Sequence, residues 1–209
     1  MNIGRLHVLT DFLFQQRFPH EELARLAIEG GADTIQFRQK AGNFRHKLHS
    51  ARRTAAVCQD TGAQLIIDDH LDIMLAVEAE GVHLGRNDFP VKDARKVLGS
   101  NKIIGATANT LKEVAAGAEA GADYIGFGPV YFSDSKANLA AVQGLEGLMQ
   151  ACKMVDIPVI AIAGITADRV SEVLEMGAHG VAIMSAISTA DDPKEATQAF
   201  RTAIDKFFG

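Results

Sequence analysis

Eight short apolar segments alternate with amphipathic helical patterns along the whole chain. The segments typical of strands are 5–11, 34–40, 63–69, 81–85, 101–108, 123–130, 157–164 and 179–186. The helical patterns cover 20–31, 44–61, 71–80, 91–99, 111–121, 144–155, 166–177 and 193–208. Most of these strands are continuously apolar, which indicates parallel strands buried on both faces. Eight strand–helix units are the number in a (β/α)8 barrel, so we predict a single TIM-barrel domain over residues 1–209.

The alternative architecture is an open, doubly wound parallel sheet. It would need fewer strands, or a Gly-x-Gly-x-x-Gly turn after the first strand, and "LTDFLFQ" contains no glycine. The steps "GGAD", "AEGV", "AGAD" and "MGAH" before four strands resemble one another, as expected of repeated modules. The barrel is therefore the favoured prediction.

Composition narrows the class of function. The net charge of −5 argues against a general nucleic-acid binder, and no apolar run approaches the ~20 residues of a membrane span. The N-terminal residues lack the pattern of a signal peptide, and Cys58 and Cys152 are interpreted as reduced packing residues. We therefore expect a cytoplasmic protein with small-molecule partners, while a homo-oligomer remains possible.

Polar residues gather where the predicted strands end. In a barrel, these carboxyl ends and the loops that follow them form the active site. Side chains alternate along a strand, so Gln36, Arg38 and Lys40 share one face, while Phe37 and Gln39 point the other way. The other polar or glycine-containing strand ends supply Asp68, Asp69, Asp88, Thr107, Ser133, Ser135, Lys136, Gly164, Met184 and Ser185. We expect all these strand ends to converge on one mouth.

Two anion sites follow from this arrangement. Arg38, Lys40 and Lys136, with Mg²⁺ on Asp69 and Asp88, suit a diphosphate. Backbone N–H groups after the seventh and eighth strands suit a monophosphate. Two alternatives stay open: an internal salt bridge could explain Arg38 and Lys40, and helix capping could explain the two adjacent aspartates. No activated nucleophile is evident, so we expect chemistry that depends on electrostatics and positioning.

The motifs "QFRQK", "IIDDHLDIMLAVEAEGVHLGRNDFP", "IIGATANT", "ADYIGFGPVYFSDSK", "IPVIAIAGI" and "GVAIMSAI" resemble thiamine phosphate synthase, in order over nearly the whole chain. The resemblance implies a TIM barrel that couples hydroxymethylpyrimidine diphosphate to thiazole phosphate, with Mg²⁺, and releases pyrophosphate. It also implies a dissociative route in which the diphosphate leaves before the thiazole nitrogen attacks.

The resemblance assigns roles by position. Arg38, Lys40, Lys136 and Thr107 would be catalytic, and Asp69 and Asp88 would bind Mg²⁺. The substrate-binding set would comprise Gln36, Phe37, Arg38, Gln39, Lys40, Asp68, Thr107, Ser133, Ser135, Lys136, Gly164, Met184 and Ser185. His83 lies mid-strand and is interpreted as a hydrogen-bonded core residue, with catalysis as the alternative.

Three positions depart from the family pattern. Asp68 replaces the usual asparagine, Ala163 replaces a glycine, and Asn109 stands where the related thiazole tautomerases carry a functional histidine. Ala163 should matter little if only the N–H of Gly164 is used. The missing histidine favours the synthase, whereas Asp68 leaves open a catalytically inactive, ligand-binding regulator.

Overall fold

Eight parallel strands close into a barrel in which each strand pairs with its neighbours in chain order and β1 pairs with β8. The computed structural model describes residues 2–11, 16–133 and 141–209. The strands are β1 Leu6–Asp11, β2 Thr34–Arg38, β3 Gln64–Asp68, β4 Gly81–Leu84, β5 Ile103–Ala108, β6 Tyr124–Phe127, β7 Val159–Ile162 and β8 Gly180–Ile183. The predicted (β/α)8 barrel is thus confirmed.

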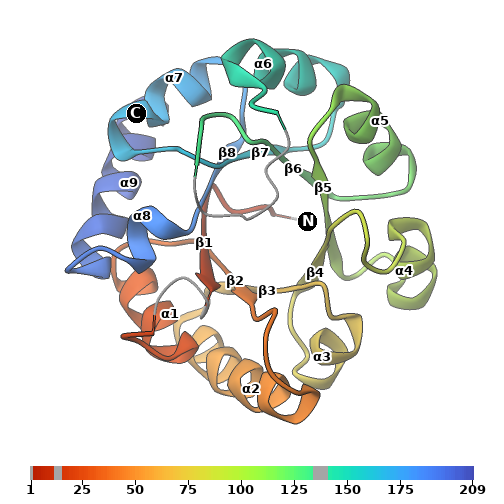
Figure 1. Ribbon diagram of the computed structural model, residues 1–209, viewed down its shortest axis with the longest axis vertical. Helices are drawn as coiled ribbons and strands as arrows, with labels where there is room; N and C mark the ends of the chain where they lie inside the picture. Colours follow the sequence, from red (N-terminus) through yellow and green to blue (C-terminus); the bar gives the residue numbers. More distant parts are fainter. Residues whose placement is uncertain (1, 12–15, 134–140) are drawn as a thin grey trace.

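The helices form a layer outside the strands (Figure 1). They are α1 His20–Glu29, α2 Phe44–Thr61, α3 Leu71–Ala76, α4 Val91–Leu98, α5 Leu111–Glu119, α6 Gly144–Met154, α7 Val170–Glu175, α8 Ser185–Ser188 and α9 Pro193–Phe208, with a 3-10 turn η1 over Ala167–Arg169. Side-chain caps begin several of them. Asn43 accepts from the His46 N–H, Thr110 from Glu113 N–H and Asp192 from Glu195 N–H.

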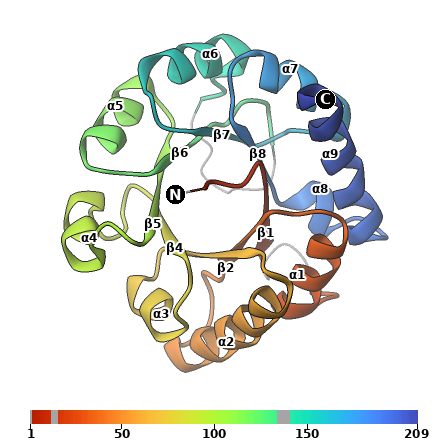
Figure 2. The ribbon, with the colours of Figure 1, turned by 180° about the vertical axis from the view of Figure 1, so that it is seen from behind.

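The core has two layers that follow the alternation of side chains along each strand. Leu6, Val8 and Ile35 belong to the large cluster between strands and helices. A smaller cluster fills the barrel itself and consists of Ile3, Leu9, Ile66, Ile103, Tyr124, Ile160, Ala182 and Met184. Ile3 belongs to the N-terminal segment, which crosses the barrel opening in Figure 2. The opposite opening, at the carboxyl ends of the strands, is therefore the side where a site can form.

All eight predicted strands extend beyond the observed ones, and the differences at β2 and β8 concern site residues. β2 ends at Arg38, so Lys40 lies beyond the strand. β8 ends at Ile183, and the short helix α8 begins at Ser185, inside the predicted strand. No helix in the described part of the chain combines the length and the apolar character needed to cross a membrane.

Candidate active site

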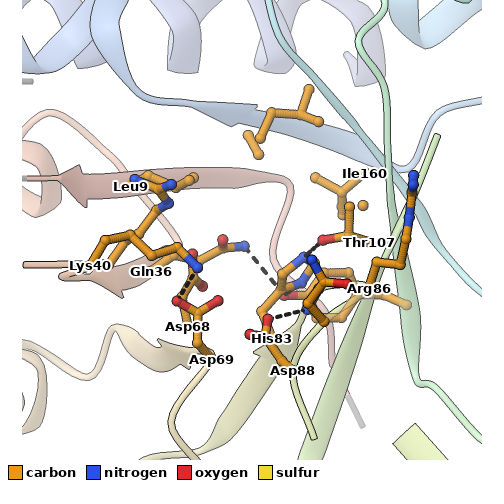
Figure 3. Close-up of a pocket in the computed structure, with 17 residues that line it drawn as sticks. Leu9, Gln36, Lys40, Asp68, Asp69, His83, Arg86, Asp88, Thr107 and Ile160 are labelled. Atoms are coloured by element: carbon orange, nitrogen blue, oxygen red, sulfur yellow. Dashed lines mark hydrogen bonds and ion pairs between the residues drawn. The ribbon is translucent and has the colours of Figure 1, made fainter. Parts of the chain in front are cut away.

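A cavity of about 230 Å³ opens at the carboxyl ends of the strands. Figure 3 shows polar side chains projecting into it from several different strand ends. Its lining consists of Leu9, Gln36, Arg38, Lys40, Asp68, Asp69, His83, Gly85, Arg86, Asn87, Asp88, Thr107, Tyr124, Gly126, Ile160, Ile162 and Ala182. The carboxyl ends of β2, β3, β4 and β5 therefore all contribute residues to one cavity, as predicted.

Arg38 forms an ion pair with Asp11, at the end of the neighbouring strand β1. The register of the barrel places these two residues directly opposite each other. The Asp11 side chain is 1% exposed and the Arg38 side chain 17% exposed, so the pair is largely removed from solvent. The internal salt bridge that the sequence left open is therefore present, and the barrel supplies Asp11 as the partner of Arg38. Contact with an anion stays a prediction, since Arg38 also lines the cavity.

Lys40, Asp69 and Asp88 form a second charged cluster. The Lys40 Nζ lies 2.5 Å from Asp69 Oδ2, and the Asp69 and Asp88 carboxyls are joined by a hydrogen bond. Burial disfavours the ionised form of Asp69, but the hydrogen bonds from Lys40 and with Asp88 outweigh it and lower its pKa. Burial and the neighbouring Asp69 raise the pKa of Asp88. Asp88 therefore keeps its proton to a higher pH than an isolated aspartate does, and the hydrogen bond with Asp69 holds that proton between the two carboxyls.

Local backbone geometry explains how the carboxyls reach each other. Asp69 follows the last residue of β3 with φ 67°, a left-handed conformation that aspartate tolerates better than most residues. Its N–H donates to the carbonyl of His83 on β4 at 2.9 Å. Asp88 lies in the turn after β4, where Oδ2 accepts the Gly85 N–H at 2.7 Å. A Cβ at position 85 would lie 2.8 Å from that oxygen, so a larger residue there would displace the Asp88 carboxyl from this hydrogen bond.

The turn at Asp69 also places Asp68 and Asp69 both on the cavity. Adjacent residues of a regular strand point in opposite directions, so the turn allows both side chains to reach the cavity. Asp69 has a hydrogen bond with Asp88. The binding of Mg²⁺ by Asp69 together with Asp88 stays a prediction.

The donor set at Asp69 and Asp88 fits Mg²⁺. This ion prefers oxygen ligands, keeps several of its waters and is commonly held by one or two carboxylates together with substrate phosphate. Among the described residues, no three or more His, Cys, Asp or Glu side chains gather as a metal site. The protein therefore offers a carboxylate pair that leaves room for water and phosphate oxygens.

A chain of polar side chains crosses the barrel interior below the carboxyls. His83 contacts the Tyr124 hydroxyl through Nδ1 at 2.9 Å and Thr107 Oγ1 through Nε2 at 2.8 Å. Gln36 Nε2 donates to the Tyr124 hydroxyl at 3.2 Å and contacts His7 Nδ1 at 3.0 Å. His83 is a hydrogen-bonded histidine of the barrel interior, as interpreted, but it also lines the cavity.

Phe37 and Gln39 do not line the cavity. The Phe37 ring is 1% exposed and packs 4.4 Å from the ring of His20, between strands and helices. The Gln39 side chain lies 3.0 Å from His46 Nδ1 on α2. Including them among the substrate-binding residues is not supported, because side-chain alternation turns both away from the barrel mouth.

The residues predicted to bind a monophosphate lie at the ends of β7 and β8. Gly164 has φ 66°, and a Cβ there would lie 2.5 Å from the carbonyl oxygen of Phe132, so only glycine fits. Met184 is the N-cap residue of α8, and Ser185 begins that helix. These three positions do not line the cavity described above, so their role stays a prediction.

The serines and the lysine predicted after the sixth strand are not seen at the cavity. Ser133 is partly buried and does not line it, and Ser135 and Lys136 lie outside the described residues.

Sequence reasoning missed several residues of the site. Asp11 ends the first strand, and the barrel register alone identifies it as the partner of Arg38. Tyr124 and His7 lie within apolar predicted strands. A polar residue on the inner face of a buried strand was the signal that could have identified them as part of the site. Arg86 and Asn87 also line the cavity, beside the predicted Asp88.

A family model described as thiamine monophosphate synthase matches residues 9–187. This chain belongs to the thiamine monophosphate synthase family. A thiamine-phosphate synthase of Salinibacter ruber is 61% identical over 204 residues, covering 98% of this chain and 90% of that protein. A thiamine-phosphate synthase of Methanocella arvoryzae is 41% identical, covering 97% of this chain and 95% of that protein.

Solved structures agree with this membership in the thiamine monophosphate synthase family. A thiamine phosphate pyrophosphorylase from Pyrococcus furiosus superposes with a TM-score of 0.90 at 38% identity. The alignment covers 98% of this chain and 97% of that one. The resemblance inferred from the motifs is thus confirmed.

Proposed function

We propose that this chain is a thiamine phosphate synthase that couples hydroxymethylpyrimidine diphosphate to thiazole phosphate and releases pyrophosphate. One observation carries the proposal: Arg38 and Lys40 share a cavity with the carboxyl pair of Asp69 and Asp88. The family relationship and the named relatives support the same reaction.

The reaction needs no nucleophile from the protein. The bond between the pyrimidine methylene carbon and the diphosphate oxygen breaks, and the electron pair leaves with the diphosphate. The lone pair of the thiazole nitrogen then forms a C–N bond to the methylene carbon. Negative charge grows on the departing oxygen, so fixed cations beside it lower the barrier. Arg38 and Lys40 are placed to hold the diphosphate and to stabilise that charge.

Asp69 and Asp88 would hold Mg²⁺, which would neutralise part of the diphosphate charge when bound. Lys40 already lies on Asp69 and can donate to a phosphate oxygen held near the same carboxylate. Thr107 and Gln36 would contact the pyrimidine. Gly164, Met184 and Ser185 would hold the thiazole phosphate, with Ser133 and Ser135 nearby, and Lys136 would complete the cationic clamp.

The alternative that this chain is a thiazole tautomerase has little support at position 109, where that branch carries its functional histidine. Asn109 stands where that branch carries its histidine, and its side chain is engaged elsewhere. Its amide nitrogen donates to the Gly128 carbonyl, and its oxygen accepts from Arg86 Nη2 at 3.2 Å. The two aspartates that this branch tends to lose are both present, which favours the synthase.

The test is pyrophosphate release from the two substrates, with the coupled product identified by mass. We expect release that requires both substrates and Mg²⁺. Replacing Arg38 or Lys136 by alanine should cut turnover at least ~100-fold, because that factor corresponds to ~2.8 kcal/mol and a hydrogen bond to a charged group contributes up to ~3 kcal/mol. Arg25→Ala is the matched control, since Arg25 lies on the solvent face of α1 beside Glu22. If the wild type binds ligands but releases no pyrophosphate, the regulator alternative is correct.

A further inference from the structure

Two lysines of one segment contact two adjacent residues of the next loop. Lys40 follows β2, and Lys47 lies in the first turn of α2. At the cavity, Lys40 Nζ lies 2.5 Å from Asp69 Oδ2 (Figure 3). Away from the cavity, Lys47 Nζ lies 3.1 Å from His70 Nε2, and neither of these two residues lines it. We call the two pairs the inner contact and the outer contact. Together they join the loop after β2 to the loop after β3.

The loop after β3 turns sharply at Asp69. The His70 N–H donates at 2.8 Å to the carbonyl of Asp68, two residues earlier, and this bond closes a γ-turn around Asp69. The φ of 67° makes it the rare and strained form of that turn. An extended Asp69 would instead point away from the cavity that Asp68 lines, since adjacent strand residues face opposite sides. The unfavourable turn is therefore what brings Asp69 to Asp88.

A strained turn persists only where the surrounding structure holds it in place. On the strand side, the Asp69 N–H donates to the His83 carbonyl at 2.9 Å. On the helix side, the His70 carbonyl accepts the Met74 N–H at 3.0 Å and so joins the turn to α3. The His70 side chain adds the outer contact to α2, which lies beside α3 (Figure 1). The outer contact is thus a side-chain restraint on the turn that leaves both carboxyls of the cavity untouched.

The lysine fixes which atom donates in the outer contact. An ammonium group can only donate, so His70 Nε2 accepts the hydrogen bond with its lone pair. On the other side of the ring, His70 Nδ1 faces Asp72 Oδ1 at 3.8 Å. Lys47 does not stabilise its own helix, because the helix dipole disfavours a cation in the first turn. The contact with His70 is what accounts for a lysine at this position.

We propose that Lys47 and His70 are positioning residues that keep Asp69 turned toward Asp88 while ligand binds. Without ligand, the inner contact also holds the loop. A diphosphate and Mg²⁺ bind the same Lys40 ammonium and Asp69 carboxylate, so the inner contact weakens once they are present. The outer contact does not reach the cavity and stays closed. This inference rests on the proposed function, and it assigns a role in that site to two residues outside the cavity.

The experiment measures by calorimetry how much Mg²⁺ strengthens the binding of inorganic pyrophosphate to variants of the outer contact. His70→Ala removes the acceptor and leaves the charge of Lys47 in place. We expect the gain from Mg²⁺ to fall by at least ~10-fold, since partners that orient a metal ligand contribute about 10- to 100-fold to metal affinity. His70→Gln keeps a side-chain oxygen that can accept from Lys47, and it should retain the gain to within ~3-fold.

Lys47→Met tests the other side of the contact. The gain is a ratio of two affinities for the same anion, so the loss of one positive charge largely cancels in it. This variant should lower the gain as much as His70→Ala does, and the double variant should lose no more than either single one. Lys194→Met is the matched control and should keep the wild-type gain, because Lys194 pairs with Glu29 on the surface.

Hydrogen exchange of the ligand-free protein is a readout that needs no activity. The Asp69 N–H should exchange at least ~5-fold faster in His70→Ala than in the wild type, because the turn opens more often. The Gly62 N–H, which caps the far end of α2, should exchange at the same rate in both proteins.

Two results would overturn the proposal. One is a His70→Ala protein that keeps the full gain from Mg²⁺, and the other is an Asp69 N–H that exchanges at the wild-type rate in this variant. If the wild type itself shows no gain from Mg²⁺, the proposed function fails at its metal site. The exchange rates alone then decide whether the outer contact holds the turn.

Discussion

Replacing Asp11 by asparagine tests the buried ion pair beneath the cavity. The variant leaves the Arg38 guanidinium, 17% exposed, with a neutral amide in place of a carboxylate that is 1% exposed. Removing one partner of a buried pair costs about 3–5 kcal/mol, and the partial exposure of Arg38 to the cavity favours the lower end. In a chain of this size, ~1 kcal/mol changes the Tm by about 2–4 °C, so we expect a decrease of roughly 6–12 °C.

The assay is urea unfolding of the wild type, Asp11→Asn, Arg38→Met and the double variant. Because each single change already removes this ion pair, the double variant should be more stable than the sum of the two losses predicts, by at least ~1 kcal/mol. Glu22→Gln removes an exposed partner of Arg25 and should cost less than ~1 kcal/mol. Single effects that simply add in the double variant would refute the reasoning.

Three further outcomes follow from particular residues. Ala163 has φ 80°, so Ala163→Gly should raise the free energy of unfolding by about 1 kcal/mol, whereas Ala161→Gly, within β7, should lower it; equal losses in urea unfolding would contradict this. Burial lowers the pKa of His7 and of His20 from 6.5 to about 4, so the unfolded chain binds more protons between these values. Stability is then complete above about pH 6.5 and falls toward pH 4, by up to roughly 3 kcal/mol per histidine, and a flat unfolding midpoint from pH 7 to 4 would count against it. Asp68→Asn removes a buried negative charge from the cavity and should leave the rate of pyrophosphate release equal or higher; a collapse would mean that the carboxylate has its own role.

The barrel was predictable because it depends on local patterns. Each unit couples a short apolar strand to an amphipathic helix, and eight such units can close into a barrel. The grouping of Lys40, Asp69 and Asp88 followed from the same rule, since all strand ends in a parallel barrel meet at one mouth. The departure at Ala163 was judged unimportant, but its positive φ shows that the backbone there favours glycine.

The parts that were missed depend on contacts between distant segments. Asp11 opposes Arg38 only because β1 and β2 pair in one particular register. The left-handed conformation of Asp69 comes from the path of the chain after β3, and periodicity carries no signal for it. The hydrogen-bonded side chains around Tyr124 cross the barrel interior. They join Gln36 to His7, which is 29 positions away in sequence, and Tyr124 to His83, which is 41 positions away.

The central claim is that Arg38 and Lys40 bind a diphosphate together with Mg²⁺ held by Asp69 and Asp88. Calorimetric titration of inorganic pyrophosphate, with and without Mg²⁺, tests it most directly in the wild type and in Asp88→Asn. Asp93→Asn is the control, because Asp93 lies on the surface of α4 and pairs with Lys96. We predict that Mg²⁺ strengthens pyrophosphate binding by at least ~10-fold in the wild type and in the control, and that Asp88→Asn abolishes this gain. The same gain in all three proteins would contradict the account.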